Sequence, residues 1–311
     1  MRVSGPAPGF PTALGAASLR TALGARSLRT ALGAPYFRTA RGALYGGDAI
    51  DWLGRLPGGA IDLVFADPPY NAGREPWDCF ASDDAYREWS QRWLAQAARI
   101  LKPTGSLYVC GFPEVLADLQ GLARPCFSGC RWLVWHYRNK ANLGRDWGRS
   151  HESILHLRRE RFALNIDEAR VPYNAHTLRY PSHPQAESSR YGGARYVWSP
   201  HPLGAKPRDV LEIPTLTNGM PEKTAHPTQK PLELVRRLVA AATAPGEWVV
   251  DPFGGSGTTY AACEALDRHW LGCELDAGYR ALIKARLAEP VSAPAAERAE
   301  SRRRAQRRKL R

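Results

Sequence analysis

An apolar run that ends in an acid, two prolines and a tyrosine limits how this chain can fold. The run, residues 61–65 (Ile-Asp-Leu-Val-Phe), predicts a strand buried in a parallel sheet. The motif that follows it consists of Asp67, Pro68, Pro69 and Tyr70. Such a motif would lie at the carboxyl edge of the sheet, where open α/β sheets bind their ligands. Consecutive prolines lack N–H donors and have a restricted φ, so the carbonyls around them act as fixed acceptors. A flat molecule with an amino group suits this site.

Strand-like and helix-like segments alternate along the rest of the chain. Helices are expected at 83–101, 114–123, 231–242, 258–266 and 277–288, and further strands at 106–112, 132–137, 153–157, 247–251 and 269–274. Ser82 is the expected N-cap of the first helix. Residues 102–105 (Lys-Pro-Thr-Gly) are expected to end this helix before the next strand begins. The alternation predicts an α/β fold with a doubly wound, mostly parallel sheet and a loop-rich insert.

Composition divides the chain into five segments. A nine-residue near-repeat containing glycine fills residues 17–43, so 1–43 is expected to be a flexible extension and the folded part to begin near Leu44. Two halves of one domain are expected at 44–158 and 226–290, separated by an insert at 159–225 that is rich in Pro, Gly, Ser and Arg. Residues 291–311 are expected to form a disordered basic tail.

The net charge of +13 is concentrated outside the motifs. Residues 1–45 hold six Arg and no acids, and residues 291–311 hold eight basic and two acidic residues, so each end carries +6. The middle, residues 121–225, holds sixteen basic and nine acidic residues, a net +7. A polyanionic partner would therefore contact the middle and the ends, although simple solvation explains the two tails equally well.

A second candidate site follows the strand expected at 247–251. Residues 251–257 (Asp-Pro-Phe-Gly-Gly-Ser-Gly) form a glycine turn before a helix, where backbone can approach a ligand and helix N–H groups are free. Glu274 ends the next strand, where an acid typically binds ribose hydroxyls. The alternative is a tight turn with a solvated Glu274. Residues 226–231 (His-Pro-Thr-Gln-Lys-Pro) precede a helix and suit either a carboxylate ligand or an ordinary proline-bounded helix start.

The six cysteines favour buried, reduced thiols over a zinc site, because no two pairs have metal-ligand spacing. Reduced thiols are typical of a cytoplasmic protein. The cysteine spacing gives no reason to expect a metal ion. No apolar stretch is long enough to span a bilayer, so we expect no membrane contact.

Together these motifs resemble the amino-methyltransferases of DNA, which use S-adenosyl-L-methionine (AdoMet). Residues 67–71, with Asn71 after the tyrosine, match the family's catalytic motif, residues 251–257 its AdoMet loop and residues 226–231 its HPTQKP box. Catalytic motif first, basic insert second and AdoMet loop last is the order of the family's beta class. The resemblance covers about 44–158 and 225–288 and implies the Rossmann-like fold of AdoMet-dependent methyltransferases, with a catalytic half, a target-recognition insert and an AdoMet-binding half.

The resemblance also implies a role for each matching residue. The catalytic residues would be Asp67, Pro68, Pro69 and Tyr70, which hold and orient the target amine. The cofactor-binding residues would be Asp48, Ala49, Thr228, Lys230, Asp251, Phe253, Gly254, Gly255, Ser256, Gly257 and Glu274, with Thr228 and Lys230 at the methionine end and Glu274 at the ribose. Asp48 suits a simple turn acid equally well. The DNA-binding residues would be Asn71, Arg138, Lys140, Arg145, Arg149, Arg190 and Arg195.

The sequence is interpreted as a site-specific DNA methyltransferase that acts on adenine N6 of a base flipped out of double-stranded DNA. The acid at position 67 favours adenine, because family members that act on cytosine N4 more often carry Ser there. Cytosine N4 remains the main alternative, followed by an RNA or protein amide methyltransferase and a DNA-binding protein without activity. A homodimer and a cognate restriction endonuclease are the partners left open.

Overall fold

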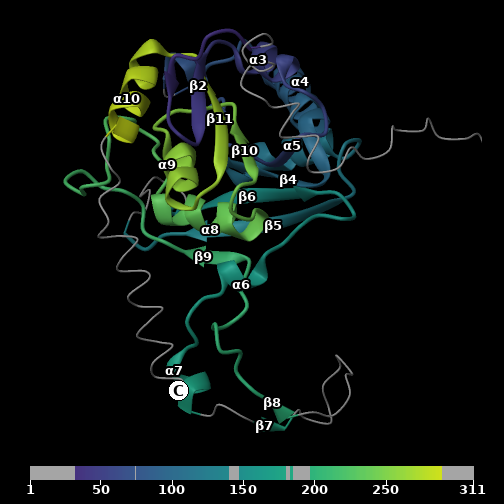
Figure 1. Cartoon of the computed structure of the whole chain (residues 1–311), viewed down its shortest axis with the longest axis vertical. Helices are drawn as coiled ribbons and strands as arrows, with labels where there is room; N and C mark the ends of the chain where they lie inside the picture. Colours follow the sequence, from purple (N-terminus) through teal and green to yellow (C-terminus); the bar gives the residue numbers. More distant parts are fainter. Residues whose placement is uncertain (1–31, 74, 140–146, 180–182, 185–196, 289–311) are drawn as a thin grey trace, which may run out of the picture.

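The structure is a computed structural model, and it describes residues 32–73, 75–139, 147–179, 183–184 and 197–288 (Figure 1). Its strands are β1 (Phe37–Arg38), β2 (Gly42–Gly46), β3 (Ile61–Ala66), β4 (Leu101–Gly111), β5 (Gly129–His136), β6 (His151–Arg158), β7 (His183–Pro184), β8 (Val197–Trp198), β9 (Val210–Glu212), β10 (Trp248–Asp251) and β11 (His269–Glu274). Its helices are α3 (Ala49–Arg55), α4 (Asp83–Ile100), α5 (Pro113–Ala123), α6 (Ile166–Ala169), α7 (Ala175–Arg179), α8 (Leu232–Ala242), α9 (Thr258–Ala265) and α10 (Ala277–Ala288), with a short 3₁₀ turn, η1, at Pro76–Asp78. None of the described helices is long and apolar enough to cross a membrane.

Nine strands form one sheet in the order β1-β2-β11-β10-β3-β4-β6-β5-β9. The run from β2 to β4 is parallel throughout, whereas β6 is antiparallel to both β4 and β5. The mostly parallel sheet predicted from the sequence is therefore confirmed. The pairing of β10 with β3, Val249 with Leu63 and Val250 with Val64, joins segments that lie almost 190 residues apart. It places the carboxyl ends of the two motif-bearing strands side by side.

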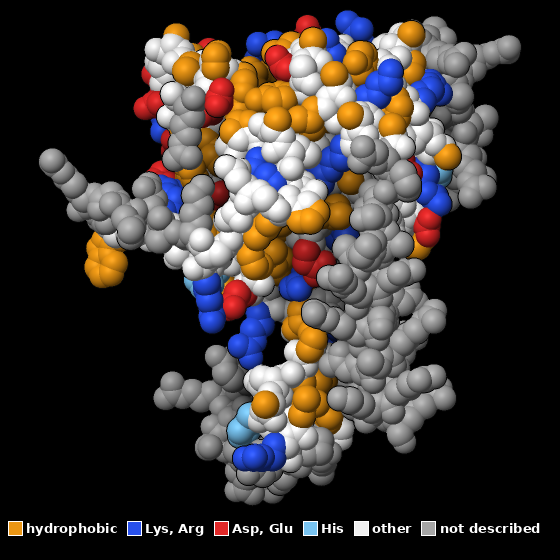
Figure 2. Space-filling view, turned by 90° about the vertical axis from the view of Figure 1, so that its left-hand side faces the viewer, with side chains coloured by type: hydrophobic (Ala, Val, Ile, Leu, Met, Phe, Trp, Pro, Cys, Tyr) orange, Lys and Arg blue, Asp and Glu red, His pale blue; other side chains and the backbone are white. Residues whose placement is uncertain are grey.

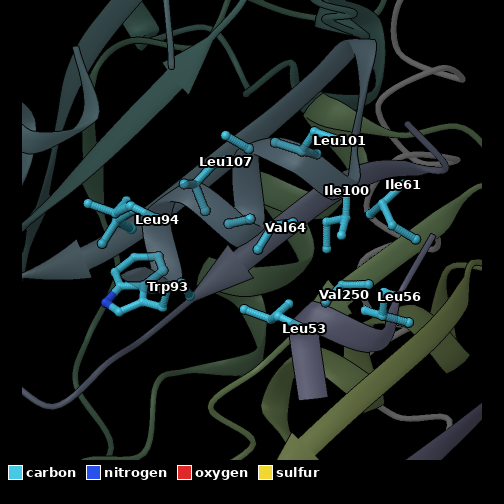
Figure 3. Packing of buried hydrophobic residues seen from close by; sticks show 14 of the residues in the cluster. Leu53, Leu56, Ile61, Val64, Trp93, Leu94, Ile100, Leu101, Leu107 and Val250 are labelled. Atoms are coloured by element: carbon cyan, nitrogen blue, oxygen red, sulfur yellow. The ribbon is translucent and has the colours of Figure 1, made fainter. Parts of the chain in front are cut away.

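Side chains of β3 alternate between two apolar clusters, one on each face of the sheet. Val64 and Ala66 pack under α3, α4 and α5, with Trp93 and Leu94 of α4 among the buried residues of that cluster (Figure 3). Leu63 and Phe65 pack on the other face, against α8 and α9. Burial on both faces explains the continuous apolar run that the sequence shows at β3.

Two boundaries differ from the sequence-based expectation. The folded part begins before Leu44, because β1 lies at 37–38 and pairs with β2 within the last copy of the near-repeat. Residues 102–105 were expected to separate the helix at 83–101 from the strand at 106–112, but they belong to that strand. β4 runs through them from Leu101, and the register jumps from Ile61–Leu101 to Leu63–Ser106, so that the extra residues of β4 form a bulge that accommodates Pro103.

The segment expected as a loop-rich insert is partly joined to the main fold. Its strand β9 pairs in parallel with β5 at the edge of the sheet. Near α6, the Asn165 N–H donates to the Ala241 carbonyl of α8 at 2.7 Å. A three-residue strand is too short to show periodicity, which is why the sequence did not indicate it. Figure 1 shows α7, β7 and β8 at the end of the molecule farthest from α3 and α10.

Candidate active site

The two motif groups line one cavity of about 880 Å³ at the carboxyl ends of the parallel strands. Its walls include the following predicted site residues: Asp48, Ala49, Asp67, Pro68, Pro69, Tyr70, Thr228, Lys230, Asp251, Phe253, Gly254, Gly255, Ser256 and Glu274. Gly257 is the one predicted cofactor residue that is not among the lining residues. Thr215 and Leu216, just beyond β9, also border the cavity, so the end of the insert reaches the site.

Asp67 belongs to a cluster of four polar side chains in this cavity. Tyr70 donates its hydroxyl to Asp67 Oδ1 at 2.7 Å, and Lys230 Nζ donates to Asp67 Oδ2 at 2.8 Å. Glu152 of β6 completes the cluster, with its Oε2 3.4 Å from both the Tyr70 hydroxyl and Lys230 Nζ. Lys230, 6% exposed, thus holds two carboxylates that come from different strands.

Burial and charge fix the protonation of this cluster. Burial disfavours the charged form of Lys230, but the carboxylates of Asp67 and Glu152 outweigh it and raise the pKa of Lys230 above its ordinary value. Burial also raises the pKa of Tyr70 well above its ordinary value, and the two carboxylates add to the rise. The cluster therefore contains an ammonium group and a neutral phenol at every pH at which the protein would act.

Asp78 holds the backbone of the motif in place. Its Oδ1 accepts from the Tyr70 N–H at 2.6 Å and its Oδ2 from the Ala72 N–H at 3.1 Å. The Tyr86 hydroxyl donates to the Pro69 carbonyl at 2.9 Å. Within the part of the chain that the structure describes, the Pro68 carbonyl accepts no hydrogen bond, so it remains available to an amine in the cavity.

The glycine loop approaches its neighbours too closely for larger side chains. Gly255 has φ +50°, and a Cβ there would lie 3.1 Å from His226 Nε2. A Cβ on Gly254 would lie 2.8 Å from the Tyr260 hydroxyl and 3.1 Å from a backbone oxygen. Gly257 (φ +74°) is the N-cap of α9, and its N–H donates to the Gly254 carbonyl at 2.7 Å.

Glu274 is buried and aligned by two backbone donors. Its Oε2 accepts from the Gly255 N–H at 2.7 Å and its Oε1 from the Asp276 N–H at 2.8 Å. Burial raises its pKa, although the two N–H groups oppose the rise. The alternative of a solvated acid after a tight turn is therefore wrong, since Glu274 is 8% exposed.

Asp251 begins the glycine loop in a buried position. Burial raises the pKa of its carboxyl to about 8, while hydrogen bonds from the Thr259 side chain and the Phe253 N–H oppose the rise. The Phe253 N–H donates to Asp251 Oδ1 at 2.9 Å, so the acid also shapes the turn that follows β10.

The HPTQKP segment has both structural and cavity-facing residues. Gln229 ties it to residues 222–224, because its side chain donates to the Glu222 carbonyl and accepts from the Thr224 N–H. His226 stacks on Trp77 at a ring-centroid distance of 6.1 Å and contacts the tilted ring of Tyr279 at 4.4 Å. Burial lowers the pKa of His226 to about 4. All three rings line the cavity.

Asp48 has a structural role as well as its place in the cavity wall. Its Oδ1 accepts from the N–H groups of Ile50 at 2.8 Å and Asp51 at 3.1 Å, so it caps α3. Both interpretations of this residue are thus compatible with its position.

Of the residues expected to bind DNA, the three that the structure describes are not among those that line the cavity. Asn71 (φ +54°) has local partners on both side-chain atoms, Asp83 and the Phe80 N–H. Arg138 pairs with Glu212 of β9 at 3.0 Å, and Arg149 pairs with Glu114 and lies over the Phe112 ring. Lys140, Arg145, Arg190 and Arg195 lie outside the described residues. Lys and Arg side chains occur at the junction between the body and the narrower part of the molecule (Figure 2).

Three residues of the site carry no signal in the sequence that singles them out: Glu152, Asp78 and Trp77. Glu152 is a lone acid at the start of an apolar strand, and such an acid ordinarily indicates a position on an exposed face. Asp78 and Trp77 follow the catalytic motif in a loop without periodicity. Glu152 is brought to the cavity by the pairing of β6 with β4, whereas Asp78 reaches it through local bonds to Tyr70 and Ala72.

Comparisons with known proteins agree with this arrangement. Residues 61–285 match a family model described as DNA methylase, N6_N4_Mtase. The chain is 30% identical to the type II methyltransferase M1.MboII of Moraxella bovis over 75% of its own length and 91% of the relative. It is also 30% identical to the DNA adenine methyltransferase YhdJ of Escherichia coli K12, over 75% of its own length and 78% of the relative.

Solved structures share the fold. The PvuII DNA methyltransferase, described as cytosine-N4-specific, has a TM-score of 0.61 at 18% identity and covers 88% of this chain and 95% of its own. A protein from Thermus thermophilus in complex with AdoMet has a TM-score of 0.56 at 23% identity and covers 80% of this chain and 94% of its own. These similarities support the AdoMet-dependent methyltransferase fold expected from the sequence.

Proposed function

This chain belongs to the N6/N4 family of DNA methylases, which use AdoMet, and we propose that it methylates the exocyclic N6 of adenine in double-stranded DNA. One observation carries the proposal: the Asp-Pro-Pro-Tyr motif and the glycine loop line a single cavity, so an amine held by Asp67 and a cofactor held near Gly255 would meet in it. Such alignment is worth roughly 7–11 kcal/mol of the activation barrier.

The donor set of the loop supports AdoMet as the cofactor. Glu274 is buried and aligned as expected of an acid that accepts from two ribose hydroxyls. The loop glycines let the backbone pack closely on its protein neighbours, so backbone borders the cavity at Gly254 and Gly255. When bound, AdoMet supplies a methyl group already activated on a sulfonium. We propose that Asp48, Ala49, Thr228, Asp251, Phe253 and Ser256 complete its pocket.

The chemistry of the amine explains the acceptors. The lone pair of a nucleobase amine is delocalised into its ring, so the amine is a poor nucleophile. Asp67 and the Pro68 carbonyl can accept from its two N–H groups and draw them out of the ring plane, which restores lone-pair character. The base would leave the duplex at a cost of a few kcal/mol and stack on Tyr70, whose ring is held edge-on by Phe112 at 4.9 Å.

The choice of adenine rests on the acid at position 67 and on the relative described as an adenine methyltransferase. The alternative is cytosine N4, which the structural neighbour of that specificity supports. Either amine can donate to a carboxylate, so the chemistry of the site accommodates both.

The target atom can be identified directly. Plasmid DNA incubated with the protein and methyl-deuterated AdoMet should yield labelled N6-methyl-2′-deoxyadenosine on digestion to nucleosides and mass spectrometry. Labelled N4-methyl-2′-deoxycytidine would overturn the adenine assignment, and the absence of any labelled nucleoside would argue against DNA as the substrate. The same DNA, sequenced with detection of modified bases, gives the recognition sequence.

We propose that the insert reads the DNA sequence and that basic residues around it contact phosphates. Support comes from its net positive charge and from Thr215 and Leu216, which bring the insert to the edge of the cavity. Arg138, just after β5, and Arg149, just before β6, are held in salt bridges that they can exchange for phosphate contacts.

A further inference from the structure

Glu152 has no assigned role, yet it is one of two carboxylates in the catalytic cluster. It lies at the start of β6, next to β4 in the sheet, and its side chain is 18% exposed. Its Oε2 lies 3.4 Å from the Tyr70 hydroxyl and 3.4 Å from Lys230 Nζ. Lys230 contacts both Glu152 and Asp67, and a second acid that shares the cation of a catalytic acid requires an explanation, because like charges repel.

The resting contacts of Asp67 compete with the target amine. One of its oxygens accepts from Tyr70 at 2.7 Å and the other from Lys230 at 2.8 Å. A short O–H···O bond to a carboxylate is among the strong hydrogen bonds in proteins. An amine that approaches Oδ1 therefore finds the Tyr70 hydroxyl already bound there.

The Tyr70 hydroxyl cannot simply be released into the cavity. Tyr70 is half-buried in the cavity wall, and a hydroxyl that a bound base shields from water is destabilising without an acceptor. Glu152 Oε2 is the other carboxylate oxygen within 3.5 Å of it among the described residues. A small rotation of the ring would shorten that contact and lengthen the one to Asp67.

We propose, on the basis of the proposed function, that Glu152 is a positioning residue that accepts the Tyr70 hydroxyl when a target amine takes its place on Asp67. Lys230 stays between the two carboxylates throughout and keeps them from repelling one another. Glu152 does not touch the reacting atoms. It acts through Tyr70, by freeing the oxygen that the amine needs.

The test uses single-turnover methyl transfer with saturating AdoMet and DNA. Glu152→Ala should slow the chemical step about tenfold, the scale of one transition-state hydrogen bond, without changing AdoMet affinity. Adding Tyr70→Phe should then restore part of the rate, because a phenylalanine ring still stacks but has no hydroxyl to occupy Asp67. A double variant at least about threefold faster than Glu152→Ala is the signature, since damage to a purely structural contact is not relieved by a second deletion.

Two variants complete the experiment. Glu152→Gln keeps an acceptor oxygen and should remain within about threefold of the wild-type rate. Glu88→Ala removes an exposed acid of α4 and serves as the matched control. If Glu152→Ala does not fold, the Gln variant decides the matter alone, and a larger reduction in its rate overturns the proposal.

An unchanged rate in Glu152→Ala, or no rescue by Tyr70→Phe, also overturns it. These failures are distinct from a failure of the proposed function, which would appear as a wild-type protein that methylates neither base.

Discussion

At the scale of single residues, the site depends on Asp67 being an acceptor next to a buried ammonium group. Lys230 is 163 residues away in the chain, and their contact at 2.8 Å couples the catalytic motif to the HPTQKP segment. The family resemblance assigns Lys230 to the methionine end of the cofactor. In the structure it contacts the catalytic carboxylates, so its role in cofactor binding stays a prediction.

Replacing Asp67 by Ala should remove methyl transfer while AdoMet still binds. Without a preorganised acceptor for the amine, the rate should fall by about 10²–10³-fold. The affinity for AdoMet, measured by calorimetry, should change by less than about threefold, because the glycine loop is untouched. Asp84→Ala, which removes an acid that is 89% exposed, is the control. A rate within about tenfold of the wild type in the Asp67 variant would contradict the role given to this residue.

Asp251 should make the stability of the fold depend on pH. Its pKa rises from 3.8 to about 8 on folding, so between these values the folded state binds more protons than the unfolded state. Stability from this group is therefore fully present below about pH 4 and is lost as pH rises through 8. Asp251→Asn cannot ionise but can still accept from the Phe253 N–H. The Tm of the variant minus that of the wild type should increase from pH 5 to pH 9, and a constant difference would contradict a buried, proton-binding Asp251.

At the scale of elements, local signals define most strands and helices. Apolar residues at helical spacing after Ser82 predict α4, and the Ser82 hydroxyl does accept from the Ala85 N–H. The bulge at 102–105 has the local signature of a break, because only the register with β3 shows that pairing continues. Glu152 and the three-residue β9 escape prediction because each is defined by partners far along the chain. Asp78 escapes it because its loop has no periodicity, although its partners Tyr70 and Ala72 are local.

Asp48 offers a way to separate an element's cap from a cofactor contact. Asp48→Ala should destabilise the protein by about 1 kcal/mol by removing the cap of α3, visible as a lower Tm. Asp48→Ser keeps a capping oxygen and should restore the Tm. If Asp48 also contacts the cofactor, both variants should bind AdoMet more weakly than the wild type. Full affinity in the Ser variant would leave the cap as its only role.

At the scale of the whole molecule, charge rather than shape should control DNA affinity. Removing residues 291–311 takes away eight basic and two acidic residues. The slope of log affinity against log salt falls by about 0.9 for each phosphate that the protein no longer neutralises, so the truncated protein should show a flatter dependence. Binding titrations at several salt concentrations measure the slope, and the methylated base should not change. An identical slope would show that this segment does not contact DNA.

Because β2 and β11 are neighbours in the sheet, the cavity depends on which strands pair and not on their order along the chain. Strands near the beginning and the end of the described chain are hydrogen-bonded neighbours, and the segment between β8 and β9 lies away from them. A circularly permuted gene, opened within the insert and closed between α10 and β1, would encode the same strand neighbours with the glycine loop ahead of the catalytic motif. Descent by such a rearrangement would leave the cavity intact while reversing its motifs, so motif order alone is a poor guide to common chemistry.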